Sequence, residues 1–570
     1  MLNEIIAKIF RQIAMILEIK GENTFKIRAY ERAAQNIEGI PNLEDIVNEE
    51  KLTQIPGIGH DLSEKIKEFV IKGKIQAYEE LKKSIPDGLL SLLDIPSVGP
   101  KTAKLLFVQL NIKSIPDLEE AIQKGKLKGI FGIKEKTISN ILKGIEVVKR
   151  GRERLTLSQA AFVADEFISR LKKLPEVKKI ASAGSLRRQK ETVRDIDILI
   201  TSKTPKKIMD TFVKLPSVRE VLAAGETKAS IRTKSDVQVD CRVVEEKSFG
   251  AALLYFTGSK DFNIKLRQIA IKKGMKLNEY GLFPAEGGPA RGGKNEGEIF
   301  KKLGLSYIEP ELREDTGEIE LALESKLPHL IQLKDILGDL HLHSTWSDGY
   351  NSIGELANTA KNLGYSYIAV TDHSQSLKVA RGLSIAGLKK KKKEIEKINN
   401  TLKGIRVLFG TEVDIDSNGN IDYPNSVLKE FEIVIAAIHS GFKQPKEQLT
   451  KRIVKACLNK YVQIIAHPTG LLWGTRDAYD IDFEQILKIA AKTNTHLEIN
   501  SFPQRLDLNS HNCRLAKEMG IKLAINTDSH TIEQLSAMKF GVAVARRGWL
   551  TREDVINTLP IEKLLKAIKK

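Results

Sequence analysis

Two aspartates one residue apart, Asp195 and Asp197, are the residues of this sequence that most directly suggest chemistry. They alternate with isoleucines, which is the periodicity of a β-strand, so both carboxylates should face the same way. Like charges on one face repel, and a divalent metal ion, which prefers hard oxygen ligands, is the usual way to hold them together. Gly184 and Ser185 stand just upstream at an expected helix start, where backbone N–H groups can bind phosphate. An acidic pair alone is more typical of an exposed strand, but the combination predicts metal-assisted phosphoryl or nucleotidyl transfer.

A second concentration of candidate catalytic residues lies after residue 338, where seven apolar runs alternate with helical patterns. This repeat predicts a closed or nearly closed parallel βα barrel. In six of the seven runs, histidines or acids stand at or just beyond the C-terminal end, where such barrels place active sites. The candidate metal ligands are His341, His343, Asp348, His373, Glu412, His439, His467, Asp528 and His530. Nine ligands could bind more than one metal ion.

A lone histidine at a strand end is more often structural, but six of the eight histidines after residue 338 belong to this set. His496 and His511 match no ligand position and are expected to be structural. The segments DLHLHS, TDHS, EVD, IHSG, AHP and TDSH resemble the polymerase and histidinol phosphatase (PHP) family. This resemblance implies two or three manganese, zinc or iron ions that activate water for attack on a phosphate ester. It also implies that Arg505 orients the phosphate of the substrate.

Glycine turns between helical patterns characterise residues 1–150. Three related turns, IPGIG, IPSVGP and GIFGIKEKT, resemble the helix-hairpin-helix motif, which grips the nucleic-acid backbone without reading its sequence. A single turn of this kind could simply join two helices of a bundle. The repetition favours DNA binding, with Gly57, Gly59, Gly99 and Gly132 as the candidate backbone contacts.

The segment TFKIRAYERAA, together with the first glycine turn and the helix after it, resembles the lyase domain of DNA polymerase beta. The resemblance implies that Lys65 forms a Schiff base with a 5′-deoxyribose phosphate, supported by Lys26 and Tyr30. Asp61 stands where that family often has a phosphate-binding lysine, which weakens the expected phosphate pocket. The alternative for Lys65 is a solvated lysine on an exposed helix face.

The stretch around the aspartate pair resembles the catalytic part of the nucleotidyltransferases. In that pattern a neighbouring strand supplies a third carboxylate, and VQVDCRVV provides Asp240. The three carboxylates would hold Mg²⁺ or Mn²⁺. By the same resemblance, Ser185 and Arg188 hold the β and γ phosphates of a nucleotide. Cys241, next to Asp240 in an alternating strand, is expected to face the core.

The segment LYFTGSKDFNIKLRQ resembles the nucleotide-binding thumb of the family X DNA polymerases. The resemblance implies that Tyr255, Phe256 and Gly258 pack against the sugar of the incoming nucleotide. It also gives Asn263 a minor-groove contact with that nucleotide and Arg267 a contact near the templating base.

Two positions depart from that family. Lys260 replaces an acid that is common in the animal enzymes, and Gln238 replaces an arginine near the third carboxylate. Neither change removes a metal ligand, although both could alter nucleotide affinity and fidelity.

Two further segments carry expectations of their own. The glycine-rich residues 286–297 predict a flexible surface loop. Five consecutive lysines at 389–393 predict a solvated helix face that could also guide a DNA strand.

Composition is consistent with these motifs. The chain has 570 residues, enough for several domains. Its formal net charge of +18 is spread along its length, which is equally consistent with binding to a long polyanion and with a proteome generally rich in lysine. Three cysteines without paired spacing argue against a disulfide framework or a cysteine zinc site and fit a reducing cytoplasm. The N-terminal segment has the periodicity of an amphipathic helix, and no apolar run is long enough to span a membrane.

We therefore expect a multidomain fold with a helical helix-hairpin-helix region, an α+β nucleotidyltransferase palm and thumb, and an α/β PHP barrel. The predicted units are a lyase-like domain at 1–75, a fingers-like domain at 76–150, the palm at 151–245, the thumb at 246–318, a linker at 319–337 and the PHP domain at 338–570.

The predicted activity is that of a DNA polymerase filling short gaps in base-excision repair, joined to a metal-dependent 3′–5′ exonuclease that could also process 3′ ends or incise abasic sites. Its partners would be gapped or primed DNA and deoxynucleoside triphosphates, and nothing in the sequence requires more than a monomer. One alternative is a nuclease whose polymerase-like half only positions DNA. A non-catalytic DNA scaffold and a phosphatase of a small metabolite are weaker alternatives.

Overall fold

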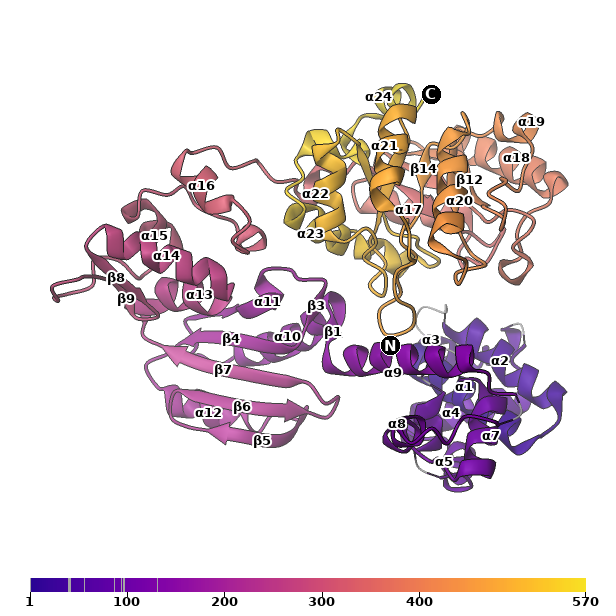
Figure 1. The fold of residues 1–570 in the computed structure, drawn as a ribbon, viewed down its shortest axis with the longest axis horizontal. Coiled ribbons are helices and arrows are strands. Elements are labelled where there is room, and N and C mark those ends of the chain that lie inside the picture. Colours follow the sequence, from indigo (N-terminus) through magenta and orange to yellow (C-terminus); the bar gives the residue numbers. More distant parts are fainter. Residues whose placement is uncertain are drawn as a thin grey trace.

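The computed structural model describes residues 2–38, 43–55, 57–86, 88–93, 95, 98–130 and 132–570. Four positions of the glycine turns, Pro56, Pro96, Ser97 and Phe131, lie outside these residues. The described chain forms a helical N-terminal part, an α/β centre with a thumb, and a C-terminal barrel (Figure 1). The predicted multidomain fold class is confirmed.

Helices make up the N-terminal part. They are α1 (Leu2–Lys20), α2 (Thr24–Glu38), α3 (Leu43–Asn48), η1 (Leu52–Gln54), α4 (His60–Lys72), α5 (Gln76–Lys83), α6 (Leu89–Leu92), α7 (Pro100–Leu110), α8 (Ile115–Gln123) and α9 (Glu135–Glu153). Along α1, Ile6, Phe10, Ile13 and Leu17 recur at helical spacing and are buried in a core confined to this part. The expected amphipathic helix is thus present.

A five-stranded sheet in the order β2-β4-β7-β6-β5 forms the palm. Its strands are β2 (Lys179–Ser182), β4 (Asp195–Thr201), β5 (Val218–Ala224), β6 (Lys228–Thr233) and β7 (Gln238–Val244). Helices α10 (Leu157–Leu171), α11 (Gly184–Arg187) and α12 (Pro205–Phe212) accompany it, and the short strands β1 (Leu155–Thr156) and β3 (Thr192–Val193) pair beside it. Strands β4 and β7 run parallel, which places their side chains in matching register.

The thumb follows with η2 (Glu246–Ser248), α13 (Phe249–Thr257), α14 (Lys260–Lys272), β8 (Met275–Asn278), β9 (Gly281–Pro284), α15 (Glu296–Lys302), η3 (Pro310–Leu312) and α16 (Glu318–Leu323). The loop prediction for residues 286–297 is wrong at its C-terminal end. There the Asn295 side chain accepts the Glu298 N–H and starts α15. The Glu296 side chain is only 5% exposed, because it binds two arginines.

Seven parallel strands in consecutive order form the C-terminal barrel: β10 (Gly338–Leu342), β11 (Tyr367–Val370), β12 (Arg406–Asp414), β13 (Ile433–Ala437), β14 (Ile464–Ile465), β15 (His496–Asn500) and β16 (Leu523–Asn526). The first and last strands meet, because the His343 N–H donates to the Ser529 carbonyl at 2.9 Å and the Leu340 N–H to Asn526 Oδ1 at 3.1 Å. The predicted, nearly closed barrel of seven strands is confirmed.

Helices and short 3₁₀ turns link and surround these strands. They are η4 (Leu333–Asp335), α17 (Ile353–Asn362), η5 (Lys378–Ala380), α18 (Ile385–Thr401), α19 (Asn425–Leu428), α20 (Lys446–Leu458), α21 (Phe483–Thr493), α22 (Ser510–Glu518), η6 (Ile532–Ala537), α23 (Met538–Arg547), η7 (Arg552–Asp554), η8 (Ile556–Thr558) and α24 (Ile561–Ala567).

The lysine run at 389–393 lies in α18, and one of its members departs from the expected solvated face. Lys391 is fully buried, its Nζ 2.8 Å from Asp372 Oδ2 and donating to the carbonyls of Val370 and Gly410.

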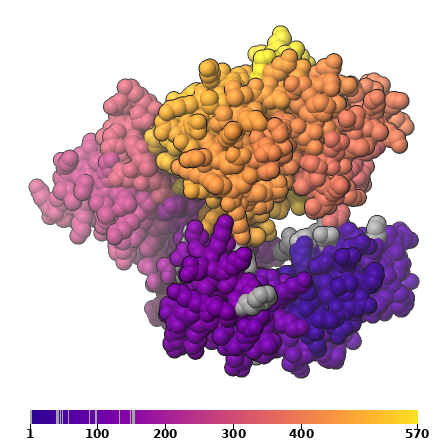
Figure 2. All heavy atoms as spheres, turned by 45° about the vertical axis from the view of Figure 1, so that its right-hand side comes forward, coloured from indigo at the N-terminus to yellow at the C-terminus, as the bar shows by residue number. Residues whose placement is uncertain are grey.

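The palm and the barrel share one contiguous hydrophobic cluster, and the N-terminal helices have a core of their own. The thumb core also includes Leu330 and Trp549, which lie outside the thumb in the sequence. In both views the barrel lies above the N-terminal helices (Figures 1 and 2). Among the described residues, no helix has the length and apolar character needed to cross a membrane.

Two candidate active sites

Three carboxylates meet on one face of the palm sheet. Asp197 on β4 lies directly opposite Asp240 on β7, and Asp195 lies two pairs further along, opposite Gln238. Their neighbours along the two strands, which include Ile196, Ile198 and Cys241, point to the opposite face and are buried. The strand alternation inferred from the sequence is therefore what brings the three acids together.

The electrostatics of this face favour a bound cation. Burial, Asp195 and Asp240 together raise the pKa of Asp197 to about 7. Asp240 accepts hydrogen bonds from the Ser230 hydroxyl and, at 3.0 Å, from the Gln238 amide. Gln238, the departure noted above, thus orients the third carboxylate. Three carboxylates gathered on one face supply the hard oxygen ligands that Mg²⁺ or Mn²⁺ prefers.

Gly184 supplies the close approach that the site needs. Its φ is +62°, and a Cβ atom there would lie 2.3 Å from Asp197 Oδ2. The Ala183 N–H donates to the Asp197 carbonyl at 2.8 Å, so the turn is hydrogen-bonded to β4. Ser185, the next residue, is half-buried in α11. A side chain at position 184 would displace the carboxylate.

Arg188 is held by the thumb. Its Nε lies 3.0 Å from Glu314 Oε1, and its Nη1 donates to the Thr257 carbonyl. The same Nη1 lies 3.1 Å from where a Cβ on Gly258 would be. The structure therefore places Arg188 directly against the nucleotide-binding turn predicted from the sequence.

The other predicted nucleotide contacts line the start of the thumb. Tyr255 is exposed and packs edge-on against Phe256 at 5.1 Å between ring centroids. The Asn263 amide donates to the Tyr255 carbonyl at 2.7 Å, and the exposed Arg267 donates to the Asn263 carbonyl at 3.2 Å. Arg242, whose guanidinium lies 4.4 Å from the Phe256 ring, links this group to β7.

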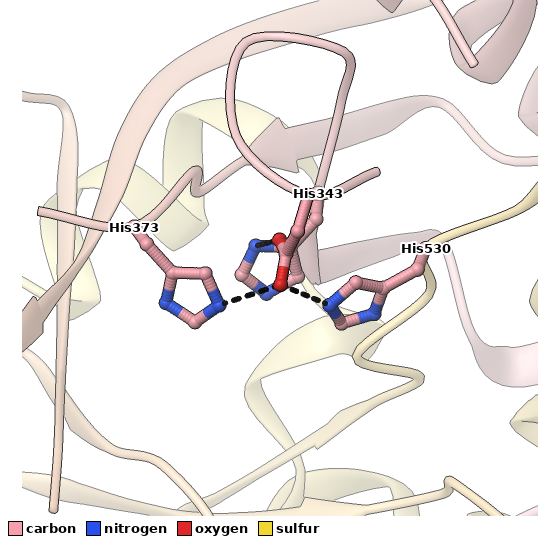
Figure 3. Close-up of side chains that lie close together, drawn as sticks. His343, His373 and His530 are labelled. Carbon is pink, nitrogen blue, oxygen red and sulfur yellow. Dashed lines mark ion pairs between the residues drawn. The ribbon is translucent and has the colours of Figure 1, made fainter. Parts of the chain in front are cut away.

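The second site lies at the C-terminal ends of the barrel strands. Figure 3 shows the imidazoles of His343, His373 and His530 directed toward one carboxylate, which belongs to Asp348. His373 Nε2 and His530 Nε2 lie 3.5 and 3.4 Å from Asp348 Oδ2, and His343 Nδ1 lies 3.7 Å from Oδ1. These four side chains could share one metal ion.

Two further groups adjoin this one. His341, His343 and Asp528 form the second, with His343 Nε2 3.1 Å from Asp528 Oδ1. His373, Glu412 and His439 form the third, with 2.9 and 3.2 Å between the imidazoles and the carboxylate.

The ninth candidate ligand, His467, approaches the same Glu412 oxygen as His439, with its Nε2 3.1 Å from Glu412 Oε1. All nine candidate ligands therefore converge, although they come from six separate apolar runs.

Orphaned polar atoms show that these side chains suit metal ions. His341 Nε2, both ring nitrogens of His343, His373 Nδ1 and Glu412 Oε2 are buried and make no hydrogen bond of good geometry, although polar atoms of other candidate ligands lie 2.9 to 3.7 Å away. Buried polar atoms normally have partners, so a cluster of unpaired nitrogens and oxygens fits coordinated cations. Mixed imidazole and carboxylate donors suit zinc, manganese or iron equally.

Several supporting residues were not foreseen. Glu498 Oε1 lies 2.7 Å from His341 Nδ1, and Asp414 Oδ1 lies 3.2 Å from His439 Nδ1. Such contacts fix which ring nitrogen faces the metal. A buried acid inside an apolar strand, as in THLEIN, was the available signal for Glu498.

Asp372 was also missed. It pairs with the buried Lys391 and accepts from the hydroxyls of Ser344 and Ser347, which brace the loop after β10.

Arg505 lies at the edge of the barrel site, its Nε 3.6 Å from Asp528 Oδ2. Its Nη1 is buried and without a partner, and its charge contributes, after burial, to lowering the pKa of His467 to about 4. An unpaired guanidinium nitrogen beside the candidate ligands can receive an anionic oxygen. His496 and His511 belong to none of the three groups.

The three glycine turns of the N-terminal part share one geometry. The N–H groups of Ile58, Val98 and Ile133 each donate to the carbonyl three residues earlier, at 2.9 to 3.0 Å. A helix begins two residues after each, and none of the three has a side-chain cap. Gly57 and Gly132 have positive φ, while a Cβ on Gly59 or Gly99 would meet nothing within 4 Å. Uncapped N–H groups behind open glycines can receive backbone phosphates.

Lys65 lies in α4, mostly covered, and its Nζ forms an ion pair with Asp61. Burial raises the pKa of the adjacent Tyr30, and the charge of Lys65 partly offsets that rise. Asp61, which replaces the expected phosphate-binding lysine, therefore pairs with the amine that a lyase reaction would use.

Four family models match separate segments of the chain. Residues 1–75 match the helix-hairpin-helix domain, 89–146 the SAM-like helix-hairpin-helix tandem, 252–314 the DNA polymerase beta thumb and 339–502 the PHP domain.

Among similar proteins, one aligns over nearly the whole chain and others align over a part of it. The chain is 40% identical over 571 aligned residues to the DNA polymerase/3′–5′ exonuclease PolX of Bacillus subtilis (strain 168), an alignment that spans 99% of both chains. A probable phosphatase of Thermoanaerobacter sp. (strain X514) is 32% identical over 231 residues, which cover 39% of this chain and 89% of the relative. A probable phosphatase of Shewanella loihica is 30% identical over a similar span, 39% of this chain and 90% of its own length.

Proposed function

Because this chain belongs to the family X DNA polymerases that carry a C-terminal PHP domain, we propose that it combines DNA polymerase and metal-dependent 3′–5′ exonuclease activities and fills short gaps in DNA repair. The observation that carries the synthetic half is the register of β4 and β7, which sets Asp197 opposite Asp240 with Asp195 beside them. The three glycine turns of the N-terminal helices and the exposed Tyr255 of the thumb support the proposal, because such features suit the binding of DNA and of a nucleotide.

In the palm, Asp195, Asp197 and Asp240 would hold Mg²⁺ or Mn²⁺, which lowers the pKa of a primer 3′-hydroxyl and neutralises the triphosphate. Gly184 lets the backbone approach the phosphates, and Ser185 and Arg188 bind them. Tyr255 and Phe256 pack against the sugar of the incoming nucleotide.

In the thumb, Asn263 and Arg267 contact the minor-groove side of the new base pair. Because minor-groove acceptors are similar in all correct pairs, these two side chains check shape rather than sequence.

In the barrel, the nine clustered side chains would hold two or three manganese, zinc or iron ions, which supply activated water. Arg505 holds the phosphate of the terminal nucleotide, and Glu498 and Asp414 keep His341 and His439 correctly oriented. The same site could clean blocked 3′ ends or incise abasic sites, because each reaction hydrolyses a phosphate ester.

The N-terminal helices, in the lyase-like and fingers-like units at 1–75 and 76–150, would grip the DNA backbone at Gly57, Gly59, Gly99 and Gly132. A lyase role for Lys65 requires the Asp61 ion pair to open, because Schiff-base formation needs a free amine. Borohydride trapping on a 5′-deoxyribose-phosphate substrate tests it, and the absence of a Lys65-dependent adduct would rule it out.

The proposal is tested on one substrate. A gapped duplex labelled at the primer 5′ end, incubated with deoxynucleotides and Mg²⁺ or Mn²⁺, should give extended products, and without nucleotides it should give shortened ones. Shortening alone would favour a nuclease whose polymerase-like half only positions DNA. Release of phosphate from small phosphomonoesters with no action on DNA would favour the activity for which the shorter relatives are named.

A further inference from the structure

The junction between the PHP barrel and the polymerase centres on Arg547, the last residue of α23. Its side chain is only 7% exposed. Nη1 lies 3.1 Å from Glu314 Oε1 and donates to the Arg188 carbonyl at 2.8 Å. Its Nε lies 3.7 Å from Glu191 Oε2, outside hydrogen-bond distance. One barrel side chain therefore reaches both the backbone of Arg188 and the carboxylate that Arg188 binds.

Glu314 is shared by three cations. Its Oε1 accepts from Arg188 Nε at 3.0 Å and from Arg547 Nη1 at 3.1 Å, and Lys190 Nζ lies at 3.9 Å. Burial opposes the ionisation of Glu314, but these three cations hold the pKa of its carboxyl below the usual range. A half-buried carboxylate needs this compensation, because an uncompensated charge there is costly.

The electrostatic field around the Arg188 guanidinium depends on how the charge of Glu314 is balanced. Counting Glu191, the junction holds three cations and two carboxylates, a net charge of about one positive unit. Without Arg547 the count falls to about zero. Arg188 would then be the only cation hydrogen-bonded to Glu314. The less compensated negative charge of Glu314 would weaken the attraction between Arg188 and an approaching triphosphate.

We propose that Arg547 is a positioning residue of the polymerase site, which balances Glu314 and fixes the Arg188 backbone so that the Arg188 guanidinium stays available to the incoming triphosphate. The PHP barrel would thereby complete the nucleotide site of the polymerase as well as carrying its own reaction. This inference rests on the proposed role of Arg188 in triphosphate binding.

The test compares Arg547→Met with Arg546→Met, because methionine keeps most of the packed side-chain stem. Arg546 lies on the same helix and at the same junction, but it pairs with Glu311 at 2.7 Å and donates to the Ile331 carbonyl at 3.0 Å. For Arg547→Met we expect KM for the deoxynucleotide to rise about tenfold with kcat little changed, since a charge-assisted contact is weakened. For Arg546→Met we expect wild-type KM.

Two further variants identify the cause. Arg547→Met combined with Glu314→Gln should restore KM to within about twofold, because the carboxylate that needed balancing is gone. Exonuclease activity should stay at the wild-type level in every variant, which shows that the barrel has folded. Equal effects of the two methionine variants, or failure of Glu314→Gln to rescue, would overturn the inference.

Arg188→Ala separates this inference from the proposal beneath it. A raised KM in Arg188→Ala with no change in Arg547→Met would rule out the role of Arg547 and leave the phosphate role of Arg188 in place. An unchanged KM in Arg188→Ala would remove the phosphate role of Arg188, and the inference with it.

Discussion

His341 Nδ1 lies 2.7 Å from Glu498 Oε1, and both side chains are fully buried in the barrel. Glu498 also accepts from the His467 N–H and from the amide of Asn526, at 2.8 and 2.9 Å, so it is held firmly behind the candidate metal ligands. This contact leaves the other ring nitrogen, Nε2, directed at Glu412 and Asp528.

Glu498→Gln should therefore weaken metal binding in the barrel by about 10- to 100-fold, as loss of such a supporting carboxylate does elsewhere. Bound metal per protein after dialysis, and exonuclease activity across a metal titration, measure the effect. Primer extension should be unchanged, and Glu518→Gln, an exposed glutamate paired with Arg514, is the matched control. Wild-type metal retention in Glu498→Gln would show that Glu498 does not support the ligands.

Gly184→Ala should lower primer extension about 100-fold, because its Cβ would displace Asp197 by a distance that matters for alignment. Gly287→Ala is the control, since Gly287 also has a positive φ, of +93°, but its Cβ would meet nothing within 4 Å. Extension rates on a primed template compare the two. Similar rates for both variants would argue against a catalytic Asp197 in this position.

The thumb should carry a pH-dependent part of its stability in Glu296. Burial alone would raise the pKa of this carboxyl, but hydrogen bonds and charge from Arg187 and Arg313 lower it to about 2. A lowered pKa means that the stabilisation is complete above about pH 4.5 and is lost as the pH falls toward 2. By this shift Glu296 contributes about 3 kcal/mol at neutral pH.

Glu296→Gln should therefore lower the unfolding temperature of the thumb at pH 7, and the difference from wild type should shrink as the pH falls from about 4.5 to 2. Thermal unfolding over this range measures it, with Glu298→Gln as the control, because Glu298 lies on the same helix but is only partly buried and faces a single lysine, Lys302, at 3.6 Å. A difference that stayed constant with pH would contradict the buried ion pairs.

Lys391→Met should destabilise the barrel by about 3 to 5 kcal/mol, because it leaves Asp372 as an uncompensated buried charge. Lys389→Met and Lys393→Met change exposed members of the same run and should stay within about 0.5 kcal/mol of wild type. Urea unfolding of the three variants makes the comparison. An equal, small effect at all three positions would restore the expectation of a solvated lysine face.

These residues show where sequence reasoning succeeded and where it stopped. Alternation predicted that Asp195 and Asp197 share a face, and strand ends predicted the convergence of the barrel histidines, because both follow from the local period of the chain. Contacts between distant segments have no such period. The pairing of Lys391 with Asp372 and the burial of Glu296 depend on which segments meet in three dimensions, so a lysine run and a glycine-rich stretch gave the wrong expectation there.

The most direct test of two separate centres uses one 5′-labelled gapped duplex with Asp240→Asn and His343→Asn as paired variants. We expect Asp240→Asn to lose extension and keep 3′–5′ degradation, and His343→Asn to lose degradation and keep extension. Loss of both activities in either variant, or extension that survives Asp240→Asn, would contradict the account.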